Sequence, residues 1–192
     1  MKSLKLIGLT LLAIVVGFVA TSCGGDKEKD EPTPKTSPVL GLIYGFSEDY
    51  FNCFDIEIHY TDVSGATKTE KITKTNCEKE TVNDQEIYFY SNFIEYAKYP
   101  MDNVNYGVVF TCKDPADEVK ESYNLTFGYS ISTIAAGQSY DKATIKSKVQ
   151  ISQHNKLRAD QLKNFCEKQL NNSSIFKGKT YKITSNGKFE EQ

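Results

Sequence analysis

The sequence predicts a mainly β domain: an antiparallel β-sandwich of the immunoglobulin-like or Greek-key type, with one helix at about residues 157–170. Several segments alternate apolar and polar residues with a period of two, which is the pattern of strands that bury one face. The chain has 12 Tyr and 11 Phe, and both residue types favour strands. Strand-like and helix-like segments do not alternate along the chain, so a parallel α/β fold is disfavoured.

The first half of the domain is predicted to consist of short strands joined by turns. The apolar run at 40–46 is the first expected strand, and 54–60 alternates apolar with polar residues. Residues 62–65 have turn chemistry, so 66–73 is expected to return as the second strand of a hairpin. Its lysines suit the edge of a sheet, where charge discourages further pairing. The polar segment 76–84 is predicted to be a loop.

The middle of the domain continues this pattern. Residues 86–91 are aromatic and strand-like, whereas 93–99 fits either a helix or a strand. Residues 104–113 are predicted to form a central strand. The clearest alternation is at 123–134, and 144–151 repeats it.

The pattern changes near the C-terminal end of the chain. Helical spacing places four apolar residues of the 157–170 segment on one face, namely Leu162, Phe165, Cys166 and Leu170. A last strand is expected at 179–184. The Asn186-Gly187 pair that follows is a strong hairpin signal.

The N-terminus has the three parts of a secretory signal peptide, which is predicted to span residues 1–22. Lys2 and Lys5 form a positive start, an uncharged apolar run follows, and small residues precede Cys23. The apolar run is too short for a typical membrane span, which needs about 20 residues. The alternative is an uncleaved N-terminal anchor helix.

The residues around Cys23 resemble a lipobox, the motif that signal peptidase II cuts in bacterial lipoproteins. The motif is Val-Ala-Thr-Ser-Cys at 19–23, with Ala20 where Leu is usual. The resemblance implies lipidation of Cys23 with a diacylglycerol on the thiol and a further acyl chain, such as palmitate, on the amino group. Two or more chains would make a stable outer-membrane anchor.

Residues 23–38 are predicted to be the lipidated cysteine and a disordered tether, and residues 39–192 a single β-rich domain. The tether contains no large apolar residue that could be buried. Its acidic start resembles the signal that sends some Bacteroidota lipoproteins to the cell surface. We therefore expect surface exposure, with a periplasm-facing protein as the alternative.

Four stretches of the domain, 44–50, 54–65, 98–100 and 106–113, resemble an uncharacterised group of lipoproteins from gut Bacteroidota. These proteins are similar in a strand and a Tyr-Thr-Asp-x-x-Gly turn that precede a strand rich in Val, Phe and Thr. The resemblance implies a small β-sandwich ectodomain, and it implies no catalytic residues.

Four cysteines follow the anchor: Cys53, Cys77, Cys112 and Cys166. In an exported protein this even number permits two disulfides in three pairings. The most local candidate joins Cys53 to Cys77, while Cys166 could be a buried free thiol on the helix. The wide spacing disfavours a zinc ribbon.

Composition and motifs restrict the classes of function. The chain has no GxSxG, HExxH, P-loop or GxGxxG motif and only two histidines, so we expect neither an enzyme nor a cofactor. Removing residues 1–22 takes away two lysines and no acids, which leaves a formal charge of −4. This charge gives no basic surface for nucleic acid.

Two groups of residues are candidate sites. Asp55, Glu57 and His59 share one strand face and could contribute to a metal or polar site, or they could be an ordinary solvated face. Tyrosines could form an exposed binding face, or half of them could point into the core. The tyrosines of this candidate face are Tyr88, Tyr90, Tyr96 and Tyr99, with Tyr106 nearby.

These features together predict a lipid-anchored protein of the cell envelope. We expect a non-enzymatic binding or adhesion module for a glycan or a protein at the cell surface, attached to the membrane through Cys23. The alternative is a structural or accessory subunit of an envelope complex. The third hypothesis is a small hydrolase or metal-dependent enzyme that uses Asp55, Glu57 and His59.

Overall fold

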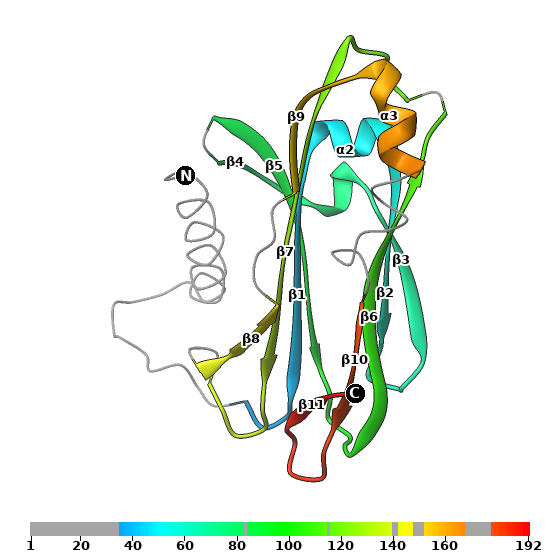
Figure 1. The fold of residues 1–192 in the computed structure, drawn as a ribbon. Coiled ribbons are helices and arrows are strands. Elements are labelled where there is room, and N and C mark those ends of the chain that lie inside the picture. The colour runs from blue at the N-terminus through cyan, green and yellow to red at the C-terminus, as the bar shows by residue number, and fades with distance from the viewer. Residues whose placement is uncertain (1–34, 83, 115, 140–141, 148–151, 168–177) are drawn as a thin grey trace, which may run out of the picture.

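The computed structural model describes residues 35–192 except 83, 115, 140–141, 148–151 and 168–177. Two antiparallel sheets face each other (Figure 1). The first has the strand order β4-β5-β1-β7-β8, with β9 also paired to β7, and the second has the order β11-β10-β6-β2-β3. The predicted β-sandwich with one helix in the C-terminal region is therefore confirmed.

Each sheet takes strands from both halves of the chain. The first sheet contains β1 (Val39–Ser47), β4 (Glu78–Val82), β5 (Gln85–Glu95), β7 (Ser122–Ile134), β8 (Thr144–Ser147) and β9 (Ser152–Arg158). The second contains β2 (Phe54–Thr61), β3 (Thr67–Ile72), β6 (Met101–Cys112), β10 (Lys179–Ile183) and β11 (Phe189–Glu191). The helical segments are α2 (Glu48–Cys53), the 3₁₀ turn η1 (Lys74–Asn76) and α3 (Ala159–Phe165).

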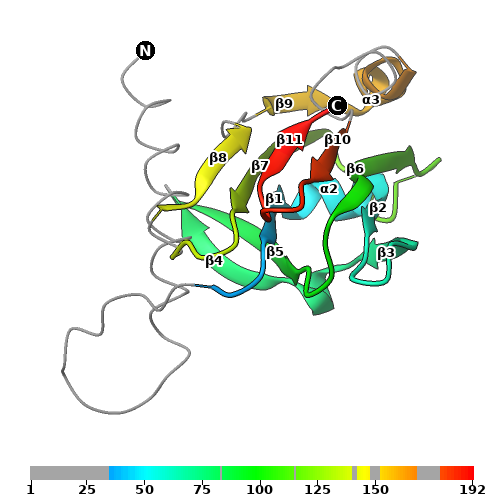
Figure 2. The ribbon, with the colours of Figure 1, turned by 90° about the horizontal axis from the view of Figure 1, so that it is seen from below.

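The core lies between the two sheets, which Figure 2 shows from below. Strand β1 is buried along its whole length and is paired on both sides, with β5 and with β7. Its residues Leu42, Tyr44 and Phe46 belong to the main core. Across the sandwich, Phe110 of β6 packs edge-on against Phe127 of β7, with ring centroids 5.1 Å apart. Aromatic side chains therefore join the two sheets.

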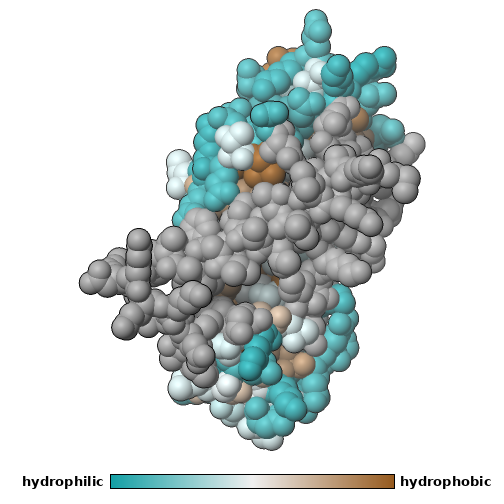
Figure 3. Space-filling model, turned by 90° about the vertical axis from the view of Figure 1, so that its left-hand side faces the viewer, coloured by the Kyte–Doolittle hydropathy of each residue, from teal (hydrophilic) through white to brown (hydrophobic). Residues whose placement is uncertain are grey.

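The other face of β1 carries a second, smaller apolar cluster that contains Ile43, Ile87 and Phe89. Phe89 lies directly opposite Gly45 in the β-ladder. A Cβ atom at Gly45 would come within 2.9 Å of the Phe89 ring, so only glycine fits beneath it. On the side of the molecule seen in Figure 3, the described surface is mostly hydrophilic with small hydrophobic areas.

Most predicted strands are confirmed. The structure has strands at the expected 40–46, 54–60 and 123–134, and the lysine-rich β3 is an edge strand as predicted. Strand β6 lies in the middle of its sheet. The Asn-Gly hairpin joins β10 to β11, with Gly187 at a φ of +71°.

Three local predictions are wrong or incomplete. The predicted loop at 76–84 contains β4, whose outward residues are charged and so hide the strand pattern. The ambiguous 93–99 segment continues β5 as far as Glu95. The helix begins at Ala159, after β9, rather than at 157. Residues 148–151 and 168–170, parts of the expected strand and helix, lie outside the described residues.

The last residues of the predicted tether pack on the domain. The backbone N–H of Lys35 donates to the carbonyl of Gln138 at 2.8 Å, and the N–H of Tyr96 donates to the carbonyl of buried Pro38 at 2.9 Å. Lys35 and Pro38 of the predicted tether therefore contact the domain, whose first strand begins at Val39. The signal peptide 1–22, Cys23 and residues 24–34 lie outside the described residues. Within the described ranges, no helix is long and apolar enough to cross a membrane.

The cysteine pairing differs from the candidate pairing. A disulfide joins Cys112 at the end of β6 to Cys166 next to α3, with a Cα–Cα distance of 6.1 Å, while Cys53 and Cys77 are free. The pairing is non-local because α3 packs on the end of the second sheet, where Phe165 contacts Phe54. Burial raises the pKa of both free thiols to about 12.

Candidate functional site

A pocket of about 350 Å³ opens where α2 meets the ends of β2 and β3. This volume is at the lower end of the range for small-molecule sites, about 300–1,000 Å³. Ten residues line the pocket, and half of them are charged. They are Phe51, Asn52, Phe54, Asp55, Lys71, Ile72, Thr73, Lys74, Lys113 and Asp117.

Helix α2 positions one wall of the pocket. It connects β1 of the first sheet to β2 of the second, and so it closes one end of the sandwich (Figure 1). Glu48 and Asp49 lie in its first turn, where negative charge interacts favourably with the helix dipole. All residues from Asp49 to Cys53 are buried, so the helix is held by tertiary contacts.

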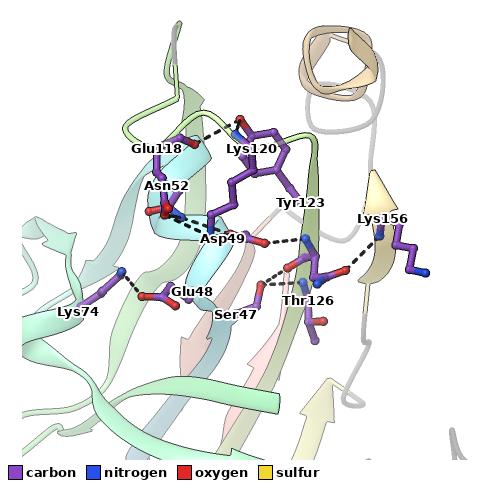
Figure 4. Close-up of polar contacts among 11 residues, drawn as sticks. Ser47, Glu48, Asp49, Asn52, Lys74, Glu118, Lys120, Tyr123, Thr126 and Lys156 are labelled. Carbon is purple, nitrogen blue, oxygen red and sulfur yellow. Dashed lines mark hydrogen bonds and ion pairs between the residues drawn. The ribbon is translucent and has the colours of Figure 1, made fainter. Parts of the chain in front are cut away.

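A polar network, which we call the α2 clamp, fixes this helix to β7 (Figure 4). The buried carboxylate of Asp49 accepts hydrogen bonds from the backbone N–H of Asn124 at 2.7 Å, from Lys120 Nζ at 2.9 Å and from Asn52 Nδ2 at 3.2 Å. These three donors offset the cost of burying the carboxylate. The hydrogen bond to Asp49 raises the pKa of Lys120.

Ser47, which precedes α2, extends the clamp. Its hydroxyl donates to the carbonyl of Asn124 at 2.7 Å and accepts from the N–H of Thr126 at 3.0 Å. The side-chain amide oxygen of Asn124 in turn accepts from the N–H of Lys156 on β9 at 3.1 Å. The clamp therefore ties α2, β7 and β9 together and holds one wall of the pocket rigid.

Two ion pairs lie on the pocket side formed by β3 and η1. Lys71 Nζ is 2.9 Å from Asp55 Oδ1, and Lys74 Nζ is 2.7 Å from Glu48 Oε1. The hydrogen bond from Lys71 holds the pKa of Asp55 below its usual value, and the hydrogen bond from Lys74 does the same for Glu48. Both carboxylates are therefore ionised at neutral pH.

Lys113 forms the third charged contact of the pocket. Its ammonium donates to the carbonyl of Phe51 at 2.8 Å and pairs with Asp117. The backbone N–H of Lys113 also donates to the carbonyl of Cys53 at 2.9 Å. Lys113 thus connects the loop after β6 to both ends of the last turn of α2.

The floor of the pocket is apolar. It is formed by Phe51, Phe54 and Ile72, all of which are buried. The ring of Phe51 packs edge-on against Tyr88 with centroids 5.5 Å apart. The pocket therefore combines a fixed apolar base with a rim of paired charges.

The predicted Asp55, Glu57 and His59 group lies on the outer face of β2, and Asp55 and His59 each contact a residue of β3. Asp55 pairs with Lys71, and His59 Nδ1 is 2.8 Å from the Thr69 hydroxyl. Of the three, only Asp55 lines the pocket. In the described part of the chain, no group of three His, Cys, Asp or Glu side chains could hold a metal ion.

The prediction of an exposed tyrosine face is wrong for Tyr88, Tyr90 and Tyr96, which are buried. Tyr90 donates to Glu70 Oε2 at 2.8 Å, and Tyr96 donates to the carbonyl of Thr61 at 2.8 Å. Tyr99 is half-buried, and Tyr106 belongs to the core. Alternate residues of β5 are directed toward the second sheet, and Tyr88 and Tyr90 are among them.

Sequence reasoning missed α2 and the lysines of the pocket. The Ser47-Glu48-Asp49 run is a recognisable start signal for a helix, because Ser is a common N-cap residue and acids favour the first turn. The sequence contains no pattern that relates Lys71 to Lys113. The two lysines come together only because β2 pairs with both β3 and β6.

No protein-family model, curated protein or solved structure matches this chain.

Proposed function

We propose that the protein is a lipid-anchored, non-enzymatic binding module of the cell envelope, and that the pocket beside α2 is its ligand site. The observation that carries this proposal is the pocket itself: a concave site with an apolar floor and a rim of fixed ion pairs. Small ligands usually bind in concave sites where apolar surface lies beside oriented polar groups, and this pocket has both, with a larger share of charged residues than most.

The charged groups of the pocket suit binding better than proton transfer. General acid–base catalysis works best with a group whose pKa is near the ambient pH. The pKa of Asp55 is instead shifted downward, away from neutrality, by its hydrogen bond from Lys71. Its carboxylate is therefore a constant acceptor of hydrogen bonds.

The membrane attachment rests on the signal peptide and Cys23 of the sequence. Labelled palmitate should be incorporated into the protein in cells, and Cys23→Ala should abolish both the label and membrane retention. A soluble, unlabelled wild-type protein would contradict the anchor. Protease treatment of intact cells distinguishes surface exposure, which digests the domain, from a periplasm-facing domain, which stays intact.

A binding screen against envelope glycans and envelope proteins tests the pocket. The proteins to compare are the wild type, Lys71→Met in the pocket, and the control Lys182→Met. Lys182 also forms an exposed ion pair on the second sheet, with Asp102 at 3.7 Å, but it does not line the pocket. We expect Lys71→Met to weaken binding and Lys182→Met to leave it unchanged. Equal binding by all three proteins would contradict the assignment of the pocket.

A further inference from the structure

We propose that the pocket takes a neutral polyhydroxylated ligand, a sugar residue of a glycan, rather than an anion. This inference rests on the proposed binding function and adds the chemical class of the ligand. It follows from the pairing of the three lysines of the rim, from the hydrogen-bonding capacity of the rim groups and from the apolar residues of the floor.

Every lysine that lines the pocket is already paired with a carboxylate, although one of these carboxylates, that of Glu48, lies outside the lining. The three pairs are Lys71 with Asp55, Lys74 with Glu48, and Lys113 with Asp117. An incoming phosphate or carboxylate would have to compete with a carboxylate that is already held beside each lysine. Its own charge would also be repelled by Asp55 and Asp117, the two acids of the lining. A neutral ligand meets no such competition.

The paired groups keep capacity for further hydrogen bonds. An ammonium group has three donors, and an ionised carboxylate has about four acceptor positions. The contact between Lys71 Nζ and Asp55 Oδ1 uses one of each. A sugar hydroxyl both donates and accepts, so a pair of neighbouring hydroxyls could bridge the carboxylate of Asp55 and the ammonium of Lys71 without separating them.

The floor suits the less polar face of a sugar ring. Phe51 and Ile72 present apolar atoms to the pocket, and the packing of Phe51 against Tyr88 fixes its ring. A few C–H groups of the ring can contact this small apolar surface while the hydroxyls at the ring edge reach the charged rim. The α2 clamp keeps the floor in place through Asp49.

Titration of the full chain in detergent with defined probes tests the inference. The neutral probes are the methyl glycosides of glucose, galactose, mannose and N-acetylglucosamine, and the anionic probes are glucuronate and inorganic phosphate. Each is measured at low and at high salt. We expect saturable binding of at least one neutral glycoside, with an affinity that salt does not change, because salt screens interactions between charges.

Variants connect the measured binding to the pocket. Asp55→Asn and Lys71→Met should each weaken binding of the neutral glycoside by about tenfold, equivalent to about 1.4 kcal/mol, whereas Lys182→Met should not. Lys71 and Asp55 have exposed side chains, so both variants are expected to fold, and circular dichroism verifies this. Loss of binding in the pocket variants alone supports the inference.

Three results would overturn it. Tighter binding of glucuronate or phosphate, decreasing with salt, would assign the pocket to an anion and leave the proposed binding function in place. Binding of a neutral glycoside that Asp55→Asn and Lys71→Met do not affect would place the sugar elsewhere. Failure of all neutral glycosides to bind would also reject the sugar, and the screen of envelope proteins would then decide the proposed function separately.

Discussion

At the scale of single residues, the fold depends on a few polar side chains whose partners are far away in the sequence. Asp49 is the clearest case, because its buried carboxylate connects α2 to a backbone N–H and a lysine more than 70 residues later. The structure places the acid within a hydrogen-bonded network. Removing the carboxylate of Asp49 would leave the donors of Lys120 and Asn124 without their acceptor.

Asp49→Ala should lower the free energy of unfolding by about 2–3 kcal/mol, the usual range for a lost hydrogen-bonded charged partner. Urea denaturation followed by circular dichroism measures this change. The control is Asp160→Ala, which removes an exposed carboxylate paired with Arg158 and should cost no more than about 1 kcal/mol. Equal losses in the two variants would show that the clamp does not stabilise α2.

Tyr44 and Tyr96 provide a matched pair of buried hydroxyls. The Tyr44 hydroxyl has no hydrogen-bond partner among the described residues, whereas that of Tyr96 donates to Thr61. Tyr44→Phe should therefore leave stability unchanged or raise it, because an unpaired buried hydroxyl is costly. Tyr96→Phe should lower stability by about 1 kcal/mol. Thermal unfolding measures the stability of both variants. A larger loss of stability for Tyr44→Phe than for Tyr96→Phe would indicate that the Tyr44 hydroxyl has a hydrogen-bond partner.

At the scale of elements, α3 depends on one covalent bond and two apolar contacts. Leu162 and Phe165 are buried against the core, and the Cys112–Cys166 disulfide fixes the end of the helix to β6. The helix is only seven residues long, so it would be marginal in isolation. The disulfide therefore adds to the apolar contacts that hold α3 on the end of the sandwich.

Reduction of the disulfide should lower the free energy of unfolding by about 2–5 kcal/mol, as found for native disulfides of small exported domains. Urea denaturation with and without a reducing agent measures the difference. The combined Cys53→Ser and Cys77→Ser variant is the control and should respond to the reducing agent as the wild type does. Non-reducing mass spectrometry should find Cys112 linked to Cys166. A different linkage, or a wild-type protein insensitive to reduction, would contradict this account.

The elements also show which parts of the fold the sequence could predict. Strand β2 and the first half of β7, residues 122–127, were predictable because one face of each is buried, which imposes alternation. Helix α2 was not, since six residues do not complete two helical turns and give no periodic stripe. The candidate site was predicted only at Asp55, because alternation identifies the face of a strand but not the neighbouring strands that supply Lys71 and Lys113.

At the scale of the whole molecule, paired surface carboxylates contribute to the dependence of stability on pH. The pKa values of Asp55 and Glu48 are both lowered by hydrogen bonds from lysines. A carboxylate whose pKa is lower in the folded state stabilises the fold above its unfolded pKa. That contribution is lost as the pH falls from the unfolded value toward the folded one.

The contribution of these two groups should therefore leave the unfolding temperature nearly constant from pH 5 to neutrality. At pH values below about 4, the ordinary pKa range of Asp and Glu, the unfolding temperature should decrease. Thermal unfolding at a series of pH values checks this. The combined Asp55→Asn and Glu48→Gln variant should lose less of its stability in acid than the wild type. An identical acid profile for the variant would show that these ion pairs do not contribute.

The position of β1 determines how a pulling force would be transmitted through the domain. An anchor at Cys23 would pull on the fold through Lys35, at the N-terminal end of β1, whereas the pocket lies beyond the other end of this strand, next to α2 (Figure 1). Tension between the membrane and a captured ligand would therefore run along β1. Its hydrogen bonds to β5 and β7 are perpendicular to the strand, so they would be sheared together rather than opened one by one.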